Sequence, residues 1–446
     1  GRGGAAGGRP PAPPPPDTHQ FGDHLLEAVK RGDVEGERID DGVRRVLRSL
    51  FRTLAAPDPE TYGPEVIACD AHVALAREAA EKSIVLLKNE GLLPFDASSM
   101  RRLLVVGPLA DTPNLGDHGS SRVYPPEVVT PLDGLRAGAP EGCQILYDRG
   151  DDLQRLRTRA AEVDAVLVVV GTTHLEEGEF IPGALGDDSA GASGNSGGDR
   201  IDLTLGEAAE ALIEAAAASQ PKVAVALMAG SAILMERWRR KVGGILMLWY
   251  PGMAGGSALA DVLFGRVNPS GHLPFTIPVR AEDLPFFDRN AETITYDLWH
   301  GYTKLERDGI EPAFPFGFGL AYTTFEFETP AVRIDSGRDL LEVVTEVHNR
   351  GGRAGDALLQ VYAGGEAPAR EQPGKRLCGF RRVHLAAGAS ESLAVQVPLR
   401  DLASFDPEAG CWRLHTTRWR ISTGASSSGR DLSAVTLSLP ERSWSV

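Results

Sequence analysis

The segment His174–Gly183, HLEEGEFIPG, holds three carboxyl side chains within four residues: Glu176, Glu177 and Glu179. It follows the apolar run Ala165–Gly171 (AVLVVVG), which predicts a buried strand. Ligands of open α/β sheets bind outside the carboxyl ends of the strands, where a carboxyl group can donate or accept a proton. Three acids in a glycine-rich loop can also be solvated surface charges. On these residues alone, the surface interpretation is favoured.

The elements around this segment predict an α/β domain. Short apolar runs bounded by Gly or Pro are typical of strands covered on both faces, as in a parallel sheet. The predicted strands are Arg101–Pro108, Asp164–Gly171, Lys222–Gly230 and Gly243–Gly252. Helical patterns are expected over Asp70–Glu90, Leu205–Ser219 and Gly255–Gly265. This alternation predicts a doubly wound α/β fold.

The composition and the hydrophobic pattern of the sequence differ on either side of this domain. Residues 1–20 are rich in Pro and Gly, and we expect them to be disordered. Two helical segments follow within Phe21–Leu54. From about Thr329 onward, short alternating runs separated by turn signals predict an all-β sandwich of immunoglobulin-like size.

Composition excludes several classes of function. The formal net charge of −15 argues against a nucleic-acid partner, because phosphate binding needs a basic face, and it suits a neutral partner such as a sugar. The four cysteines have no C-x-x-C spacing, which indicates neither a zinc site nor a disulfide framework and favours a reducing compartment. No apolar run is long enough for a membrane span, so no membrane partner is expected. Phosphate-loop, dinucleotide and zinc-protease motifs are absent from the sequence, so we expect no cofactor and no metal.

Several long segments, in this order, carry a family resemblance. They read AREAAEKSIVLLKNEGLLPF, WYPGMAGGSALADVLFG, VNPSGHLPFTIP, GYTKLERDGIEPAFPFGFGLAYTTFEF and KRLCGFRRVHLAAGASESLAVQV. Together they resemble glycoside hydrolase family 3, the retaining β-glucosidases and their relatives. The resemblance runs from about Phe21 to the C-terminus and implies O-glycosyl hydrolysis. It also implies three parts in sequence, namely barrel helices, a doubly wound α/β sandwich domain and a fibronectin type III-like β-sandwich.

The resemblance also implies a part that this sequence lacks. Family members begin with a TIM-like barrel that carries the nucleophilic aspartate in a Ser-Asp-Trp type motif, and no such motif occurs here. A barrel needs about 250 residues. We therefore expect a C-terminal portion of such an enzyme, and the sequence leaves open whether this portion is active without the barrel. Its expected domains are the terminal barrel helices and a linker at 21–69, the α/β domain at 70–280, a linker at 281–328 and the sandwich at 329–446.

The resemblance gives the acidic segment a role. Retaining hydrolysis needs a nucleophile and an acid/base about 5–5.5 Å apart, and the acid/base must keep its proton near neutral pH through burial or neighbouring acids. Many family members take the acid/base from a loop that reads Glu-Gly-aromatic, with Asp-Arg further on. Glu177-Gly178 is the best match, so Glu177 is the first candidate, Glu179 the second and Glu176 the third. Asp199 and Arg200 match the Asp-Arg and could position the loop or form a surface pair.

Other residues could contact a sugar. Asp117, His118 and Arg122 gather after the first predicted strand, in a sugar-facing or interdomain loop. Trp249 follows a later strand, where its ring could stack on a sugar, although packing in the core or at an interface is favoured for it.

Three functional hypotheses remain open from the sequence. The first is a β-glucosidase-type hydrolase acting on a β-glucoside or oligosaccharide. The second is a non-catalytic carbohydrate-binding or scaffolding protein built from the same domains. The third is a split enzyme whose barrel comes from a separate polypeptide, and a homo-oligomer is also open. We expect a cytoplasmic location. The sequence does not determine the sugar, the linkage or secretion.

Overall fold

The computed structural model describes residues 21–55, 63–116, 123–177, 200, 202–288, 291–366, 371–415 and 417–445. The chain divides into two compact units, Gly1–Val66 and Ile67–Val446, and each is treated by itself. In the first unit, helices α1 (Asp23–Arg31) and α2 (Gly36–Leu54) contain no buried residue. No helix among the described residues is long and apolar enough to cross a membrane.

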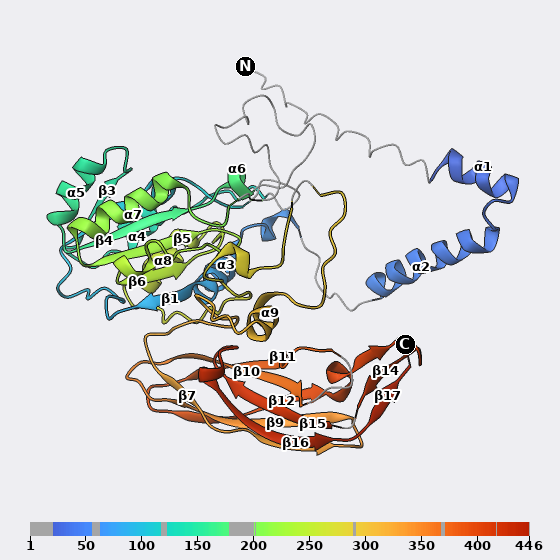
Figure 1. Cartoon of the computed structure of the whole chain (residues 1–446). Helices are drawn as coiled ribbons and strands as arrows, with labels where there is room; N and C mark the ends of the chain where they lie inside the picture. The colour runs from blue at the N-terminus through green and yellow to red at the C-terminus, as the bar shows by residue number, and fades with distance from the viewer. Residues whose placement is uncertain are drawn as a thin grey trace. The chain divides into compact units, whose positions relative to one another are not determined.

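The second unit begins with an α/β domain around a six-stranded sheet (Figure 1). Its strands are β1 (Val85–Asn89), β2 (Arg102–Val106), β3 (Gln144–Asp148), β4 (Ala165–Gly171), β5 (Val223–Met228) and β6 (Gly244–Met247). Their order across the sheet is β1-β6-β5-β4-β2-β3, with β1 antiparallel to β6 and every other pair parallel. The middle strands β4, β5 and β6 are buried almost throughout, which explains why their sequences read as continuous apolar runs.

Helices cover both faces of this sheet. They are α3 (Asp70–Ser83), α4 (Pro131–Gly138), α5 (Leu153–Ala161), α7 (Glu207–Ser219) and α8 (Gly255–Leu263). Helices α3, α4 and α8 contribute to one apolar core, while α5 and α7 contribute to the other. The helices after β2 and β4 thus cross to opposite faces of the sheet. The predicted doubly wound fold is confirmed.

One local prediction about this sheet was wrong, and one strand was not predicted. The helical pattern expected over Asp70–Glu90 ends at Ser83, and the next residues form the edge strand β1. The run Ile84–Leu87 is buried on every side, so tertiary pairing with β6 overrides its helical spacing. Strand β3 was missed because its side chains are mostly half-buried and its apolar run is short.

Helix starts in this domain follow the usual capping chemistry. Thr130 caps α4 by accepting a hydrogen bond from the Asp133 amide, and Pro131 occupies the first turn. Asp152 caps α5 by accepting from the amides of Gln154 and Arg155. These caps set where the chain turns back after β2 and β3.

The C-terminal part of the second unit is a β-sandwich, as predicted. One sheet has the order β11-β10-β15-β16, the other β12-β9-β7 with β8 beside β9, and β13-β14-β17 form a small third sheet. The strands are β7 (Phe325–Phe327), β8 (Ala331–Asp335), β9 (Leu340–Asn349), β10 (Gly355–Gly365), β11 (Arg376–Leu385), β12 (Ser390–Pro398), β13 (Ser404–Asp406), β14 (Cys411–Leu414), β15 (Thr417–Gly424), β16 (Leu432–Leu439) and β17 (Arg442–Trp444). Their inward residues share one apolar core.

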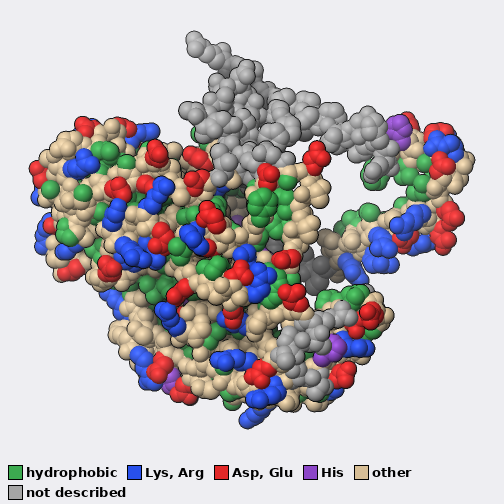
Figure 2. All heavy atoms as spheres, viewed as in Figure 1, with side chains coloured by type: hydrophobic (Ala, Val, Ile, Leu, Met, Phe, Trp, Pro, Cys, Tyr) green, Lys and Arg blue, Asp and Glu red, His purple; other side chains and the backbone are tan. Residues whose placement is uncertain are grey.

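The two domains of the second unit are joined by specific contacts. Helix α9 (Gly301–Arg307) lies in the connecting segment, and its Tyr302 hydroxyl accepts a hydrogen bond from the Leu377 amide of β11. The Arg382 guanidinium donates at 3.0 Å to the hydroxyl and to the carbonyl oxygen of Ser270. On the visible face, acidic and basic side chains are interspersed over both domains (Figure 2).

Candidate active site

The acidic segment begins directly after the central strand β4. Gly171 ends this strand, and a Cβ at that position would overlap the carbonyl oxygen of Met228 on β5. The glycine therefore lets the two strand ends approach closely. The next residues form the short helix α6 (His174–Glu177), which carries Glu176 and Glu177. The position expected for these two acids, outside the carboxyl end of a strand, is the one observed.

The Glu177 side chain is only 9% exposed, and its Oε1 atom is held by two donors. The Ser231 hydroxyl donates a short hydrogen bond to it, and Arg200 Nη1 lies 3.3 Å away. Ser231 follows β5, while Arg200 precedes α7. The Oε1 atom therefore links the segment that follows β5 to the segment that precedes α7.

The other oxygen, Oε2, is held by three donors. The Tyr250 hydroxyl lies 2.6 Å away, the Thr172 hydroxyl 2.7 Å and the Gly230 amide nitrogen 2.8 Å. These residues follow β6, β4 and β5 respectively, which are neighbours in the sheet. The carboxylate of Glu177 therefore lies where three strand ends meet.

Arg200 is as buried as its partner, with 9% of the side chain exposed. Besides Glu177, its guanidinium donates to the Ser231 hydroxyl at 2.8 Å and to the Ala232 carbonyl at 3.1 Å through Nη1. Its Nη2 donates to the Thr204 carbonyl at 3.0 Å. The loop-positioning role stays a prediction, since Asp199 and the loop that precedes it lie outside the described residues.

The electrostatics of Glu177 differ from what the sequence led us to expect. Burial raises the pKa of this carboxyl group, but hydrogen bonds from Ser231, Tyr250, Gly230 and Thr172 outweigh burial, and the pKa lies below its ordinary value. In turn, burial and the hydrogen bond to Glu177 raise the pKa of the Tyr250 phenol. At neutral pH the pair is therefore an ionised carboxylate with a protonated phenol.

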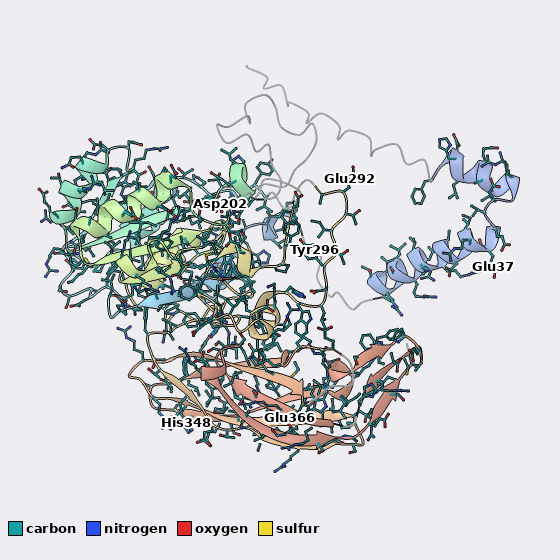
Figure 3. All side chains as sticks on the ribbon, viewed as in Figure 1. Glu37, Asp202, Glu292, Tyr296, His348 and Glu366 are labelled. Carbon is teal, nitrogen blue, oxygen red and sulfur yellow. The ribbon has the colours of Figure 1, made fainter. Side chains whose placement is uncertain are left out.

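A cavity of about 490 Å³ opens beside this cluster. Its lining residues are Glu177, Arg200, Leu203, Gly230, Ser231, Tyr250 and Phe287. The Phe287 ring is 51% exposed. Tyr296, further along the same connection before α9, is 57% exposed (Figure 3). The lining of this cavity therefore combines the charged groups of Glu177 and Arg200 with the exposed aromatic side chain of Phe287.

The two neighbouring acids of α6 line different cavities. Glu176 is exposed, and its Oε2 accepts from the Thr173 amide at 2.8 Å. It lines a second cavity of about 460 Å³ together with Arg149 and residues of α7. Adjacent positions on one turn of helix thus give two carboxyl groups with separate surroundings.

Of the remaining predicted site residues, the structure describes only Trp249. Glu179, Asp117, His118 and Arg122 lie outside the described residues. The Trp249 indole donates at 2.9 Å to the Ser83 carbonyl and meets the Phe275 ring edge-on at 5.6 Å. Its ring packs against the sheet core, and the neighbouring Tyr250 lines the cavity instead.

Sequence reasoning missed most of the groups that hold Glu177. Thr172, Gly230 and Ser231 are ordinary residue types without a motif. Their common signal is position, since each lies within three residues of the end of β4 or β5, and both strands were predicted. Nothing in the sequence indicated that Phe287 would line the cavity.

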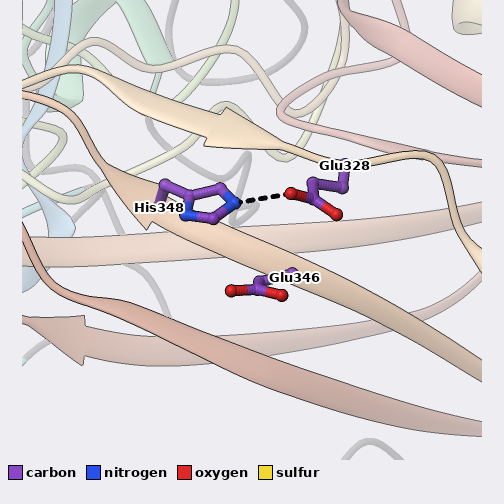
Figure 4. Close-up of side chains that lie close together, drawn as sticks. All are labelled: Glu328, Glu346 and His348. Carbon is purple, nitrogen blue, oxygen red and sulfur yellow. Dashed lines mark hydrogen bonds and ion pairs between the residues drawn. The ribbon is translucent and has the colours of Figure 1, made fainter.

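One cluster of metal-ligating side chains lies in the sandwich, on the sheet that holds β9. Glu328, Glu346 and His348 have ligand atoms within 4.8 Å of one another (Figure 4). The Nε2 atom of His348 is 2.9 Å from Glu328 Oε1, in an ion pair when the imidazole is protonated. This ion pair accounts for the contact between the imidazole and Glu328.

Comparison with known families decides the identity of the fold. The glycosyl hydrolase family 3 C-terminal domain matches residues 84–322, more than half of the 446 residues. The fibronectin type III-like domain matches residues 357–427. This chain belongs to glycosyl hydrolase family 3. The resemblance drawn from the sequence is confirmed.

Similar proteins in this family are longer than this chain. The β-glucosidase BoGH3A of Bacteroides ovatus is 30% identical over 449 residues, covering 92% of this chain and 57% of the relative. A β-xylosidase of Formosa agariphila is 31% identical over 439 residues, covering 93% and 57%. The chain therefore spans little more than half the length of these curated relatives.

Solved structures agree with this assignment. A family 3 β-glucosidase from Bifidobacterium adolescentis matches with a TM-score of 0.78 and 28% identity, over 94% of this chain and 60% of that one. The β-D-glucoside glucohydrolase of Trichoderma reesei matches with a TM-score of 0.83 and 26% identity, over 94% and 63%.

Proposed function

We propose that this protein takes part in the hydrolysis of β-glycosides by a retaining, β-glucosidase-type mechanism. The observation that carries the proposal is the cluster of charged and hydroxyl groups at the ends of β4, β5 and β6, beside a cavity of about 490 Å³. Family membership and the printed names of the relatives support the same chemistry.

In this mechanism two carboxyl groups divide the work. A nucleophile attacks the anomeric carbon, while an acid protonates the leaving oxygen and later, as a base, activates water against the glycosyl-enzyme ester. We propose that the acid/base comes from the acidic segment that holds Glu176, Glu177 and Glu179. The nucleophilic aspartate would come from the barrel of the family, in the same polypeptide or in a second one.

The substrate class follows from the relatives. Their names include β-glucosidases, a β-xylosidase and an exo-α-(1→6)-L-arabinopyranosidase, so glycosides are their common substrates. We propose a β-glucoside as the substrate of this protein. The exposed ring of Phe287 at the cavity edge offers a surface on which an aryl group or a second sugar could stack.

The test measures hydrolysis of an aryl β-glucoside and an aryl β-xyloside. The chain is assayed alone, and again after fusion to the N-terminal part of the Bacteroides ovatus relative that it does not match. We expect hydrolysis in the fusion, with the glucoside preferred, and loss of it when a catalytic carboxyl group of the acidic segment is replaced. A correctly folded fusion that binds glucose without hydrolysing either substrate would instead favour a non-catalytic carbohydrate-binding protein.

A further inference from the structure

We propose that Glu328, Glu346 and His348 bind one divalent transition-metal ion of the zinc class, and that this ion links the first strand of the β-sandwich to β9 (Figure 4). No metal was expected from the sequence, because these residues match none of the metal-binding motifs. Binding of the ion is independent of glycoside hydrolysis, so it can be tested on the chain by itself.

Strand pairing brings the three side chains to one face of the sheet. Side chains alternate along a strand, and Val347 of β9 lies in the sandwich core, so Glu346 and His348 on either side of it point outward. Glu328 follows β7, whose Phe327 pairs with Val347. The Glu328 amide donates at 2.9 Å to the Glu346 carbonyl oxygen. The two acids are therefore direct neighbours across the strands.

The described residues leave a negative charge on this face without a partner. Like charges directly opposite each other in an antiparallel pair are destabilising. His348 Nε2 lies 2.9 Å from Glu328 Oε1, which gives Glu328 one partner. Glu346 has no hydrogen-bond or ion-pair partner among the described residues, and Arg350 further along the chain is paired with Glu326 at 2.5 Å. A cation between the three groups would offset the repulsion between the two carboxylates.

The distances suit an ion bound by one nitrogen and two oxygens. All three ligand atoms lie within 4.8 Å of one another. Zinc binds His nitrogen and carboxylate oxygen at about 2.0–2.2 Å, which places two ligand atoms of a tetrahedral site about 3.3 Å apart. The His348–Glu328 contact is already shorter than this. The Glu346 carboxylate therefore has to move by at most about 1.5 Å, which rotation of its side chain provides. Water would take the fourth position.

The donor set selects the class of ion. Imidazole nitrogen suits zinc, copper, iron and nickel, whereas calcium and magnesium take oxygen ligands. Two carboxylates also neutralise the charge of one divalent ion. The ion would join Glu328 to two residues of β9, and β7 is a strand of only three residues at the edge of its sheet. The expected effect is therefore a firmer attachment of β7, the first strand after the segment that connects the two domains.

The experiment titrates the whole chain with ZnCl₂ by isothermal titration calorimetry, after removal of bound metal with a chelator. His348→Gln and Glu346→Gln each remove one ligand and keep a side chain of similar size. We expect each variant to lose one zinc site of the parent, or to weaken it at least about tenfold. CaCl₂ should leave this site unoccupied at concentrations at which ZnCl₂ fills it.

Two control variants separate this site from zinc binding elsewhere on the chain. His384→Gln removes an imidazole of the same sandwich that pairs with Asp356 at 2.7 Å and belongs to no three-ligand group among the described residues. Glu342→Gln removes an acid from the same face of β9. Both should bind zinc as the parent does. Unchanged zinc binding in both ligand variants, or an equal loss in the two controls, would overturn the site. Equal binding of calcium would also overturn it, because it would indicate an unspecific acidic surface.

Amide hydrogen exchange tests the link between the strands. If the ion must leave before β7 separates from β9, zinc at ten times its dissociation constant should slow exchange in Phe325–Phe327 about tenfold. The same zinc concentration should have no such effect in His348→Gln. Zinc that binds the parent without slowing exchange in β7 would refute the link.

Discussion

Replacement of Arg200 by Met tests how strongly the cluster at the strand ends depends on the one cation that the described residues contribute to it. The guanidinium donates to Glu177, Ser231 and two backbone carbonyls, and only 9% of the side chain is exposed. Met keeps the apolar stem but leaves the Glu177 carboxylate without its ion pair.

The magnitude follows from these contacts. Hydrogen bonds to charged groups contribute about 1.5–3 kcal/mol each, but contacts made by one side chain are not additive. Removal of one partner from a buried ion pair costs about 3–5 kcal/mol, and we expect Arg200→Met to lower the free energy of unfolding by that amount. Arg149→Met is the control, because Arg149 is 59% exposed and lies 3.7 Å from its acid partner. It should cost less than about 1 kcal/mol.

The assay is urea unfolding followed by tryptophan fluorescence, completed as a double-mutant cycle with Glu177→Gln. Because both residues hold the same cluster, the double variant should be less destabilised than the sum of the single variants, by about 1–3 kcal/mol. A loss below about 1 kcal/mol for Arg200→Met, or strictly additive effects, would refute a buried, mutually dependent pair.

Two further predictions concern groups away from the site. Burial raises the pKa of Asp148, but donors from Arg155, Gly150 and Arg159 outweigh it and hold the value at about 2. Relative to about 3.9 in the unfolded chain this contributes about 2.6 kcal/mol, present above pH 4 and lost as the pH falls toward 2. Thermal melts should show this acid loss in the parent and not in Asp148→Asn, and parallel curves would contradict it. Burial raises the pKa of the Cys378 thiol to about 12, so Cys378→Ser should leave the number of thiols that react with a disulfide reagent at pH 8 unchanged until the protein is unfolded. A lower count in the folded variant would show that this thiol is accessible.

The predictable part of this fold is the part governed by local pattern. Strands such as β4 and β5 are buried on both faces, so their apolar runs are visible without any partner. The edge strand β1 was predicted as helix because its sequence continues a helical spacing, and only pairing with β6 makes it a strand. A pairing between strands more than 150 residues apart in the sequence cannot be detected from a short stretch of neighbouring residues.

The same limit explains the outcome at the acidic segment. Residue types place carboxyl groups at the end of β4, and this placement is observed. The resemblance ranks Glu177 above Glu176 through the Glu177-Gly178 match, but the sequence does not show how the surroundings of the two carboxyl groups differ. The difference arises from Ser231 and Tyr250, which reach Glu177 from the ends of β5 and β6.

Three of the four hydrogen-bond donors that lower the pKa of Glu177 lie more than 50 positions away in the sequence, and the fourth, Thr172, lies close to it. Glu177 was expected to have a raised pKa because the acid/base of the family must keep its proton. Burial alone would have produced that effect, and burial is the larger single influence on this group. Four hydrogen-bond donors on three strand ends reverse its sign. The pKa of an acid at a strand end is thus determined by the hydrogen-bond donors that the sheet brings to it as well as by its burial.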